Sequence, residues 1–217
     1  AGRDPAGTVA RVADRLFDEQ PRASREVGLG VLQVWQALAE RSGRGSGDAE
    51  LTLLFTDLVG FSSWALEVGD DAALELLRAV ARAIEPPVLA HRGKVVKRLG
   101  DGLMATFPTP QLGFEAVQQA RLRLREVRVA GHQPRLRAAL HTGRPRALGG
   151  DYLGVDVNVA ARLVERAGAD ELLVSDTALA GLDPEAVQTR RKKSFAFSSP
   201  KGVPAGMVVY SATPRTP

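Results

Sequence analysis

The chain has 217 residues, a formal net charge of +4 and a sequence pI near 9.8. A length of this order suits one medium domain with a full core, plus an appendage. The chain contains no cysteine, which excludes disulfides and thiolate metal sites. With 44% hydrophobic and 25% charged residues and no long uncharged apolar run, the composition indicates a globular protein without a transmembrane helix or signal peptide.

The net positive charge of the chain raises the question of which anionic ligands it could bind. The positive charges are dispersed, and aromatic residues make up only 5%, too few for evident base-stacking platforms. A polyanionic small molecule such as a nucleoside triphosphate explains local positive charge equally well. The basic run Arg190–Lys193 is interpreted as a solvated loop face, with nucleic-acid binding as its alternative. We therefore expect no nucleic-acid partner.

Residues 1–47 are predicted to form a helical appendage, and 48–217 a separate domain. The glycine- and serine-rich stretch 41–47 predicts a flexible linker between them. The appendage helix either packs on the domain or a partner copy, or transmits an input from an upstream regulatory or membrane segment. Its apolar stripe has helical spacing and consists of Val27, Val31, Val34, Trp35 and Leu38.

The domain opens on a short apolar run, Leu51–Thr56, which predicts a strand buried on both faces. Asp57 follows it and would present a carboxylate at the rim of a sheet. Gly60 permits a tight turn, and Ser62 or Ser63 can cap a following helix. A carboxylate beside helix-terminal N–H groups suits a metal–triphosphate, although a strand-end Asp is more often a turn or cap residue.

Helical and strand patterns interleave along the rest of the domain. The predicted helices are Asp71–Ala90, ending near Pro86 and Pro87, then Leu112–Val129 and Val155–Ala167. The predicted strands are a hairpin over Gly93–Phe107 that turns at Gly100-Asp101-Gly102, then Pro134–Thr142, Leu172–Ser175 and Gly206–Tyr210. This order lacks strict β-α alternation and favours an α+β sandwich with its helices on one face.

Two pairs of polar residues are candidates for chemistry. Asp57 and Asp101, each at the end of a predicted strand, together make an oxygen-rich site for Mg²⁺ or Mn²⁺. Asn158 and Arg162 are four residues apart on a predicted helix, so they share a face that suits a phosphoryl transition state. Ordinary turn chemistry and a polar helix face are the alternatives. The three histidines, which lack metal-ligand spacing, are His91, His132 and His141.

Four motifs occur in the order F-T-D-L-V-G-F-S, V-K-R-L-G-D-G, L-H-T-G-R and D-Y-L-G-V-D-V-N-V-A-A-R. Together they resemble the catalytic domain of class III nucleotidyl cyclases, of the bacterial, mycobacterial-like adenylyl cyclase kind. The resemblance covers about Glu50–Tyr210. It implies an α+β fold with a ferredoxin-like βαββαβ core that works as a head-to-tail homodimer, with active sites at the subunit interface.

The resemblance also implies a role for individual residues. Two Mg²⁺ or Mn²⁺ ions would be held by Asp57, Asp101 and the backbone carbonyl of Leu58. Adenine would be recognised by Lys97 and Asp151, ribose oriented by Asn158, and charge on the α-phosphate stabilised by Arg162. The triphosphate would contact Val59, Gly60, Phe61, Ser62, Arg144 and, near the C-terminus, Lys201. Lys97 and Asp101 lie in one hairpin but would serve different sites of the dimer.

The expected function is that of an adenylyl cyclase, which converts ATP to 3′,5′-cyclic AMP and pyrophosphate by metal-assisted attack of the ribose 3′-hydroxyl. A catalytically weak nucleotide-binding regulatory module of the same fold, or a guanylyl cyclase, is the alternative. The stretch Leu148–Tyr152 lacks the acidic signature of diguanylate cyclases. A cytoplasmic catalytic domain is expected, without excluding a membrane tether through a missing segment.

Overall fold

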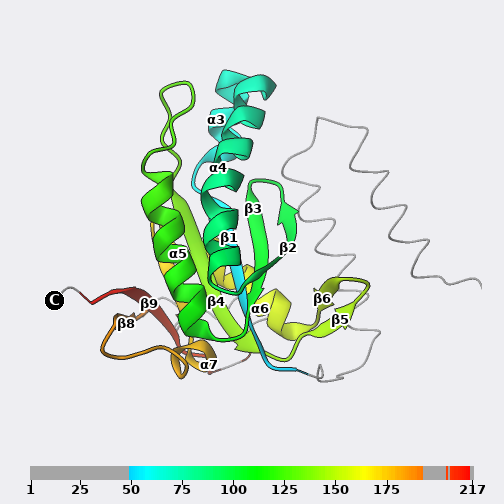
Figure 1. Cartoon of the computed structure of the whole chain (residues 1–217), viewed down its shortest axis with the longest axis vertical. Helices are drawn as coiled ribbons and strands as arrows, with labels where there is room; N and C mark the ends of the chain where they lie inside the picture. Colours follow the sequence, from blue (N-terminus) through cyan, green and yellow to red (C-terminus); the bar gives the residue numbers. More distant parts are fainter. Residues whose placement is uncertain (1–48, 193–203, 205, 216–217) are drawn as a thin grey trace, which may run out of the picture. The chain divides into compact units, whose positions relative to one another are not determined.

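The computed structural model describes residues 49–192, 204 and 206–215. The predicted appendage and linker, and Lys193 and Lys201, lie outside the described residues. The frame of the described domain is a seven-stranded sheet with the order β2-β3-β1-β4-β7-β9-β8 (Figure 1). Its strands are β1 (Leu51–Leu58), β2 (Lys94–Leu99), β3 (Gly102–Phe107), β4 (Leu136–Gly143), β7 (Leu172–Ser175), β8 (Val187–Arg191) and β9 (Val209–Pro214).

Within this sheet β4 and β7 run parallel, and the other neighbouring strands are antiparallel. A separate two-stranded hairpin pairs β5 (Arg146–Leu148) with β6 (Asp151–Leu153). The helices of the described domain are α3 (Phe61–Val68), α4 (Asp70–Ala90), α5 (Pro110–Leu124), α6 (Val155–Arg166) and the short α7 (Asp176–Leu179).

Two interlocked βαβ units form the centre of the domain. In the unit β1-α4-β2, strand β3 lies between the two parallel strands, and in β3-α5-β4 strand β1 does so. This split arrangement is that of ferredoxin-like folds. The predicted α+β fold with a ferredoxin-like core is therefore confirmed, and strands β7, β9 and β8 extend the sheet beyond it.

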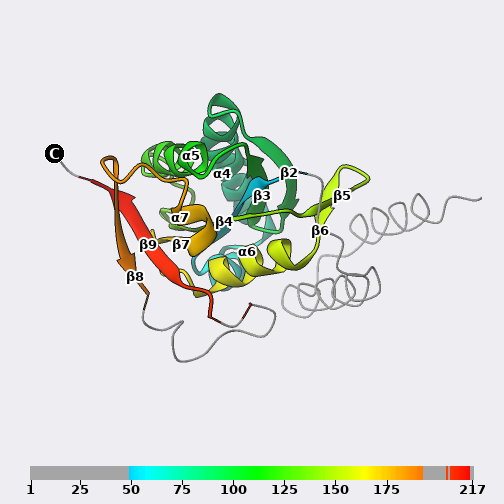
Figure 2. The same ribbon diagram turned by 90° about the horizontal axis from the view of Figure 1, so that it is seen from below.

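The sheet is covered on both faces, as Figure 2 shows end-on. Side chains alternate along β1, so that Leu54 and Leu58 join the core under α4 and α5, whereas Leu53 and Phe55 join the core under α6. The prediction of helices on one face was wrong. Because the apolar run of β1 is buried on both sides, each side requires its own cover, and α6 supplies the second.

Helix α4 ends at Ala90, as the predicted range Asp71–Ala90 does, but it runs straight through Pro86 and Pro87, which therefore do not mark its end. Pro87 and Val88 are buried in the core, which offsets the two missing N–H donors. The last turn is closed by His91, whose backbone N–H donates to the carbonyl of Pro87 at 3.1 Å.

Helix α3 begins without the serine cap that the sequence suggested. Gly60, with φ of 73° in the left-handed region, is its N-cap, and Ser62 and Ser63 lie within the first turn. Only Val59 and Gly60 separate β1 from α3, so the serines come too late to cap the helix.

Other helix and strand boundaries differ from the sequence predictions at positions where the local sequence signals are weak. Helix α5 begins at Pro110, capped by the Thr109 hydroxyl, and ends at Leu124 instead of Val129. Strand β4 begins at Leu136 rather than at Pro134. Strand β9 starts at Val209, three residues later than predicted.

The predicted basic loop is also wrong in part, because Arg190 and Arg191 lie on the edge strand β8. Lys192 follows the strand and binds the carboxylate of Glu171, with Nζ 2.6 Å from Oε1. Charged side chains on an edge strand oppose pairing with another sheet, which is a structural use for this run. Helix α7 and the β5–β6 hairpin are too short to have given a sequence signal.

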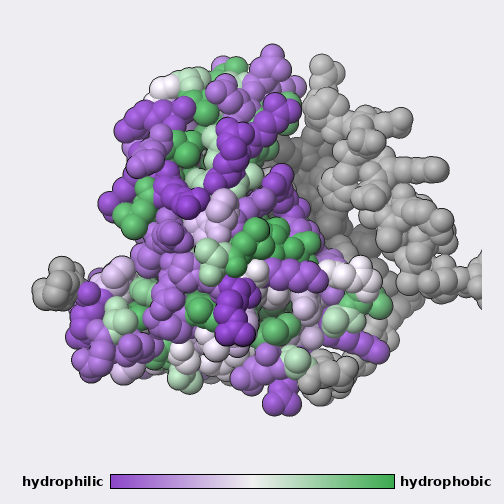
Figure 3. All heavy atoms as spheres, viewed as in Figure 1, coloured by the Kyte–Doolittle hydropathy of each residue, from purple (hydrophilic) through white to green (hydrophobic). Residues whose placement is uncertain are grey.

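The face of the domain shown in Figure 3 is mostly hydrophilic, with small and separate hydrophobic patches. Exposed large apolar side chains on helices α3 and α4 are Leu66, Leu74 and Leu89. Among the described residues, every helix is too short or too polar to traverse a lipid bilayer.

Candidate active site

Two predicted metal ligands meet at one end of β1. Asp57 is the penultimate residue of β1 and lies on the α6 side of the sheet, because it follows Leu53 and Phe55 in the alternation. Asp101 occupies the β2–β3 turn, and its Oδ2 accepts a hydrogen bond from the backbone N–H of Leu58 at 3.2 Å. Burial, together with the charge of Asp57, raises the pKa of Asp101 to about 6. The two carboxylates are therefore close enough to repel each other.

The turn that carries Asp101 is held against β1 by a close backbone approach. A Cβ atom on Gly102 would lie 2.3 Å from the carbonyl oxygen of Thr56, so a side chain there would push the strands apart. Gly102 thereby fixes the position of Asp101 relative to Asp57.

Arg137, which the sequence did not single out, occupies this edge as well. It is the register partner of Asp57 on the neighbouring strand β4. Its Nε donates to Asp57 Oδ2 at 2.6 Å, and its Nη2 contacts the same oxygen. Its Nη1 donates to the backbone carbonyl of Glu165 on α6 at 3.3 Å. The guanidinium thus connects the end of β1 to the C-terminal turn of α6.

The predicted adenine-recognition residues lie in contact within one chain. Lys97 of β2 and Asp151 of β6 form an ion pair, with Nζ 2.6 Å from Oδ2, although they are 54 residues apart in sequence. Oδ1 of Asp151 accepts the backbone N–H of Tyr152 at 2.7 Å, which fixes the orientation of the carboxylate. A cation and a carboxylate thus face the same partly exposed position.

Asn158 and Arg162 lie on α6 with the spacing expected from the sequence. The hydrophobic side of that helix, which includes Val159 and Leu163, packs on the sheet. Arg162 is engaged with its own helix: its Nη1 donates to both carboxylate oxygens of Glu165, at 3.1 and 3.0 Å. In this conformation the guanidinium has a partner that a substrate phosphate would have to replace.

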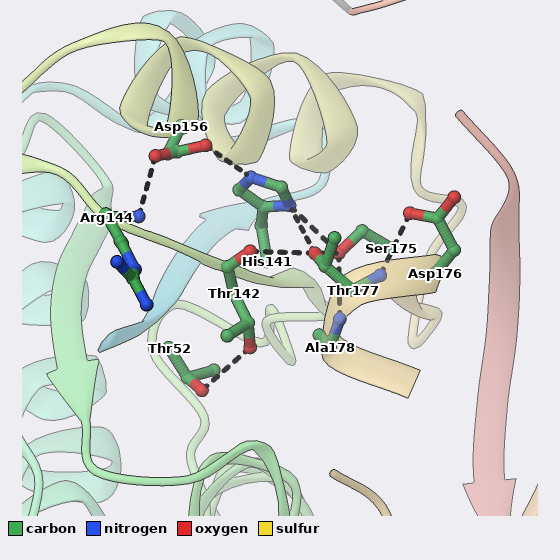
Figure 4. Close-up of polar contacts among 9 residues, drawn as sticks. All are labelled: Thr52, His141, Thr142, Arg144, Asp156, Ser175, Asp176, Thr177 and Ala178. Atoms are coloured by element: carbon green, nitrogen blue, oxygen red, sulfur yellow. Dashed lines mark hydrogen bonds and ion pairs between the residues drawn. The ribbon is translucent and has the colours of Figure 1, made fainter. Parts of the chain in front are cut away.

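The loop after β4 is organised by Asp156, in the first turn of α6 (Figure 4). Asp156 Oδ2 accepts the backbone N–H of Arg144 at 2.8 Å, and Oδ1 lies 3.1 Å from His141 Nε2. The hydrogen bond to His141 is the main reason why the pKa of Asp156 is below its ordinary value. Gly143 is required here, because a Cβ atom on it would lie 2.2 Å from Asp156 Cγ.

His141 is only 2% exposed and joins Asp156 to a cluster of hydroxyl groups. Its Nδ1 lies 2.9 Å from Ser175 Oγ and 3.3 Å from Thr177 Oγ1 (Figure 4). Ser175 also caps α7, where its Oγ accepts the backbone N–H of Ala178. His141 is thus a buried residue of the core whose ring nitrogens both have hydrogen-bond partners.

The side chain of Arg144 points away from this cluster in Figure 4. Its guanidinium makes no ion pair or hydrogen bond within the part of the chain that the structure describes. An open pocket of about 540 Å³ adjoins it, lined in part by His141, Asp156, Thr177 and Met207. Arg144 is therefore a cation available to an anionic ligand.

Known proteins resemble this chain in sequence. No family model matches it. An adenylate cyclase of Streptomyces coelicolor is 32% identical over 172 residues, which are 74% of this chain and 42% of that protein. A pH-sensitive adenylate cyclase of Mycobacterium tuberculosis is 33% identical over 135 residues, or 60% of this chain and 32% of its own length. The chain thus spans less than half the length of these curated relatives.

Solved structures share the fold. A Trypanosoma brucei adenylate cyclase in its monomeric state gives a TM-score of 0.64 at 19% identity, covering 77% of this chain and 95% of that one. The adenylyl cyclase CyaB of P. aeruginosa gives 0.61 at 21% identity, with coverage of 77% and 95%. A dimeric guanylyl cyclase domain of the fungus Blastocladiella emersonii gives 0.65 at 15% identity, with 79% and 99%. The chain belongs to the class III nucleotidyl cyclases.

The carboxylate edge of this cyclase domain suits a hard divalent cation. Asp57 Oδ1 has no hydrogen-bond partner among the described residues, and burial together with the charge of Asp57 raises the pKa of Asp101. Carboxylate and carbonyl oxygens are the donors that Mg²⁺ and Mn²⁺ prefer. Across residues 49–192, 204 and 206–215, no cluster of three or more His, Asp or Glu side chains forms a metal site. A cation here would therefore also draw on backbone or substrate oxygens.

Three polar residues of the cyclase domain were missed from the sequence. Arg137, Asp156 and Glu165 each bind a predicted site residue or its backbone. A signal existed for Glu165, which stands three residues after Arg162 on the same predicted helix. The contacts of Arg137 and Asp156 depend on strand register and on a helix-to-strand approach, which no local pattern reveals.

Proposed function

We propose that this domain is an adenylyl cyclase, which converts ATP to 3′,5′-cyclic AMP and pyrophosphate. The observation that carries the proposal is the contact between Lys97 and Asp151. An ammonium donates to a ring nitrogen of adenine, and a carboxylate accepts from its exocyclic amine. Guanine presents the opposite polarity at these positions. Adenylate cyclases from Streptomyces coelicolor and Rhizobium meliloti, at 32% and 34% identity, support the assignment.

Asp57, Asp101 and the carbonyl of Leu58 would hold two Mg²⁺ or Mn²⁺ ions. Burial and, after it, the nearby charge of Asp57 raise the pKa of Asp101, and a cation bound between the two carboxylates would relieve their repulsion, which supports this role. When bound, the ions would lower the pKa of the ribose 3′-hydroxyl and neutralise the leaving pyrophosphate.

The protein's own groups would bind and orient the triphosphate. The backbone from Val59 to Ser62 leads into the N-terminus of α3, where N–H groups of the first turn can donate hydrogen bonds to phosphate oxygens. Arg144 is held at its backbone by Asp156 and carries an available guanidinium. Lys201, which we also propose for the terminal phosphate, lies outside the described residues.

Asn158 would orient the ribose, and Arg162 would stabilise charge that develops on the α-phosphate. The ribose 3′-oxygen would attack the α-phosphorus in line, and the bond from that phosphorus to the oxygen bridging to the β-phosphate would break, so that pyrophosphate leaves. The hydroxyl proton would pass to water, to a substrate phosphate or to one of the two aspartates. For Arg162 to act, it must exchange Glu165 for the phosphate.

We propose that the sites are shared between two chains of a homodimer. Asp57, Asp101 and Arg144 would come from one chain, and Lys97, Asp151, Asn158 and Arg162 from its partner. Within one chain, Asp57 is bonded to Arg137 and Arg162 to Glu165, so the proposed metal ligand and the proposed catalytic arginine have different partners.

A guanylyl cyclase is the second candidate, since guanylyl cyclase domains are among the structures that share the fold. The deciding experiment supplies ATP or GTP with Mg²⁺ or Mn²⁺ and measures both cyclic nucleotides. Cyclic AMP from ATP, lost in Asp57→Asn and Asp101→Asn, supports the proposal. Cyclic GMP from GTP as the only product would favour the guanylyl enzyme. Nucleotide binding without either product would identify a regulatory module.

A further inference from the structure

We propose that the pocket between the last turn of α5 and the start of β4 binds a small tetrahedral oxyanion such as inorganic phosphate. The pocket has a volume of about 260 Å³ and lies at the end of the domain that Figure 1 draws at the top. Its charged lining residues are Arg121, Arg125, Arg135 and Asp170, so positive charge predominates. None of the described residues that we propose for the cyclase reaction lines it.

The pocket is separate from the carboxylate edge at Asp57. Leu124 and Leu136 line the pocket and belong to the core under α4 and α5. Asp57 follows Leu53 and Phe55 in the alternation along β1 and therefore lies on the α6 side. The apolar wall of the pocket and the proposed metal ligand are thus on opposite faces of the sheet.

The first argument for an anion is the environment of the Arg121 guanidinium. Its Nε and Nη2 are buried and have no hydrogen-bond partner among the described residues. Burying the donors of a charged group without partners costs free energy. The same burial lowers the pKa of Arg121 below its ordinary value. A ligand that accepts hydrogen bonds and carries negative charge would remove this cost.

The second argument is that the carboxylates near Arg121 are already engaged. The charges of Asp170 and Glu171 favour the charged form of Arg121, but they offset the effect of burial on its pKa only in part. Arg135 Nε donates to Asp170 Oδ2 at 2.7 Å. Lys192 Nζ donates to Glu171 Oε1 at 2.6 Å. Each carboxylate thus has a cation of its own, and Arg121 has no ion-pair partner within the described residues.

The third argument is a second cation at the same pocket. Arg125 is exposed, lines the pocket and makes no side-chain ion pair within the part of the chain that the structure describes. Its backbone is held in place, because Gln133 Nε2 donates to the Arg125 carbonyl at 3.0 Å. A planar guanidinium can donate two parallel hydrogen bonds to a phosphate, which makes arginine pairs suited to this ion. A small rotation of the Arg121 side chain would turn its unmatched N–H groups toward the ligand.

The size of the pocket limits the ligand to a small ion. Pockets that enclose drug-sized molecules have volumes of about 300–1,000 Å³. A volume of about 260 Å³ suits a free oxyanion better than a whole nucleotide. We therefore assign the pocket to the ion itself and not to the phosphate group of a larger molecule.

Phosphate binding to the full chain is measured by isothermal titration calorimetry at constant ionic strength with EDTA present. EDTA removes divalent ions, so the proposed metal site does not contribute and the result is independent of cyclase activity. Arg121→Met removes the charge at similar length, whereas Arg121→Lys keeps the charge and loses the planar fork. Arg123→Met is the matched control, because Arg123 is exposed on the same helix and does not line the pocket.

We expect the wild-type chain and Arg123→Met to bind phosphate saturably and with equal affinity. Arg121→Met should weaken binding by about tenfold or more, and Arg121→Lys by about threefold to tenfold. At a phosphate concentration about ten times the Kd, the Tm of the wild-type chain should rise by about 3–6 °C. Phosphate also stabilises proteins in general, and the smaller rise in Arg121→Met, compared with Arg123→Met, removes that effect.

Equal phosphate affinity in Arg121→Met and Arg123→Met would overturn the inference, as would a wild-type chain without saturable binding. If Arg121→Met does not fold, wild-type affinity in both Arg121→Lys and Arg125→Met would overturn it instead. Adenosine monophosphate is titrated in parallel and should show no binding that depends on Arg121. If it does bind in that way and inorganic phosphate does not, the ligand is a phosphate ester and the assignment to a free ion is wrong.

Discussion

Nη1 of Arg162 donates to both carboxylate oxygens of Glu165, three residues further along α6, at 3.1 and 3.0 Å. The contact is an i,i+3 pair in which the Glu165 side chain is 51% exposed. Pairs of this kind contribute little to stability, so the arginine can leave its partner without a large loss. This ion pair holds the guanidinium of Arg162 close to where it would act in catalysis. The pair is weak enough for a substrate phosphate to replace Glu165.

Replacing Glu165 by Gln should therefore free Arg162. We expect kcat for cyclic AMP formation to rise by about twofold to fivefold, and the free energy of unfolding to change by less than about 0.5 kcal/mol. Steady-state assays and urea unfolding measure the two quantities. Glu115→Gln is the control, since Glu115 contacts Gln111 on α5. A fall in kcat would mean that Glu165 orients Arg162 and does not withhold it.

Mixing two inactive variants tests the shared sites. Asp57→Ala and Arg162→Ala should each abolish activity. In a random mixture about half the dimers are mixed, and each mixed dimer has one intact site of two, so about a quarter of wild-type activity should return. Gel filtration confirms that both variants dimerise. A mixture that stays inactive although mixed dimers form would rule out the shared-site arrangement.

The base preference should follow Lys97 and Asp151. Lys97→Glu combined with Asp151→Ser should lower kcat/KM for ATP by about 10²-fold or more, because two hydrogen-bonding groups no longer match adenine. The same variant should use GTP better than the wild-type chain does. Competition assays with both nucleotides measure the ratio. Asp151→Ser alone, which lacks the new acceptor for guanine, should lose ATP use without gaining GTP use.

Asp156 should make stability depend on acid pH. Its pKa in the folded chain is below the ordinary value of 3.8, mainly through the hydrogen bond to His141. A carboxylate whose pKa is lower in the folded chain than in the unfolded chain stabilises the fold at pH values above the unfolded-state pKa. This stabilisation is lost as the pH falls through the folded-state pKa. Asp156→Asn should therefore cost about 1–3 kcal/mol at pH 7, and progressively less below pH 3.8. Urea unfolding at several pH values gives this difference.

Thr177→Val is a control for that experiment. It removes a hydroxyl that contacts His141 on the other ring nitrogen, and donates to the carbonyl of Thr142. The cost of Thr177→Val should change less between pH 7 and pH 3 than the cost of Asp156→Asn does, because the hydroxyl contacts no carboxylate. If the free-energy costs of the two substitutions changed with pH in the same way, Asp156 would not be the source of the pH dependence of stability.

The sequence revealed the parts of the fold that are set by short-range patterns. The apolar run before Asp57 identified a strand buried on both faces, and the Gly-Asp-Gly turn identified the hairpin that carries Asp101. The α6 pair Asn158 and Arg162 followed from helical spacing. Local signals misled at Pro86, where core burial outweighs the missing hydrogen bonds, and at Ser62, which follows a glycine cap.

What the sequence could not supply was the set of contacts between distant strands. The joining of Lys97 to Asp151 came from resemblance to a family and not from spacing, since 54 residues separate them. Arg137 faces Asp57 only because β1 and β4 pair in one particular register. A shift of that register by one residue would place the arginine on the opposite face of the sheet.

Arg137 has a consequence for the proposed dimer as a whole. It fastens Asp57 to the carbonyl of Glu165, and the Glu165 side chain in turn holds Arg162. In a head-to-tail pair these two ends serve opposite catalytic centres. Within one chain, a continuous series of contacts would thus connect the two catalytic centres. Substrate binding at one centre would then change the position of the catalytic arginine at the other.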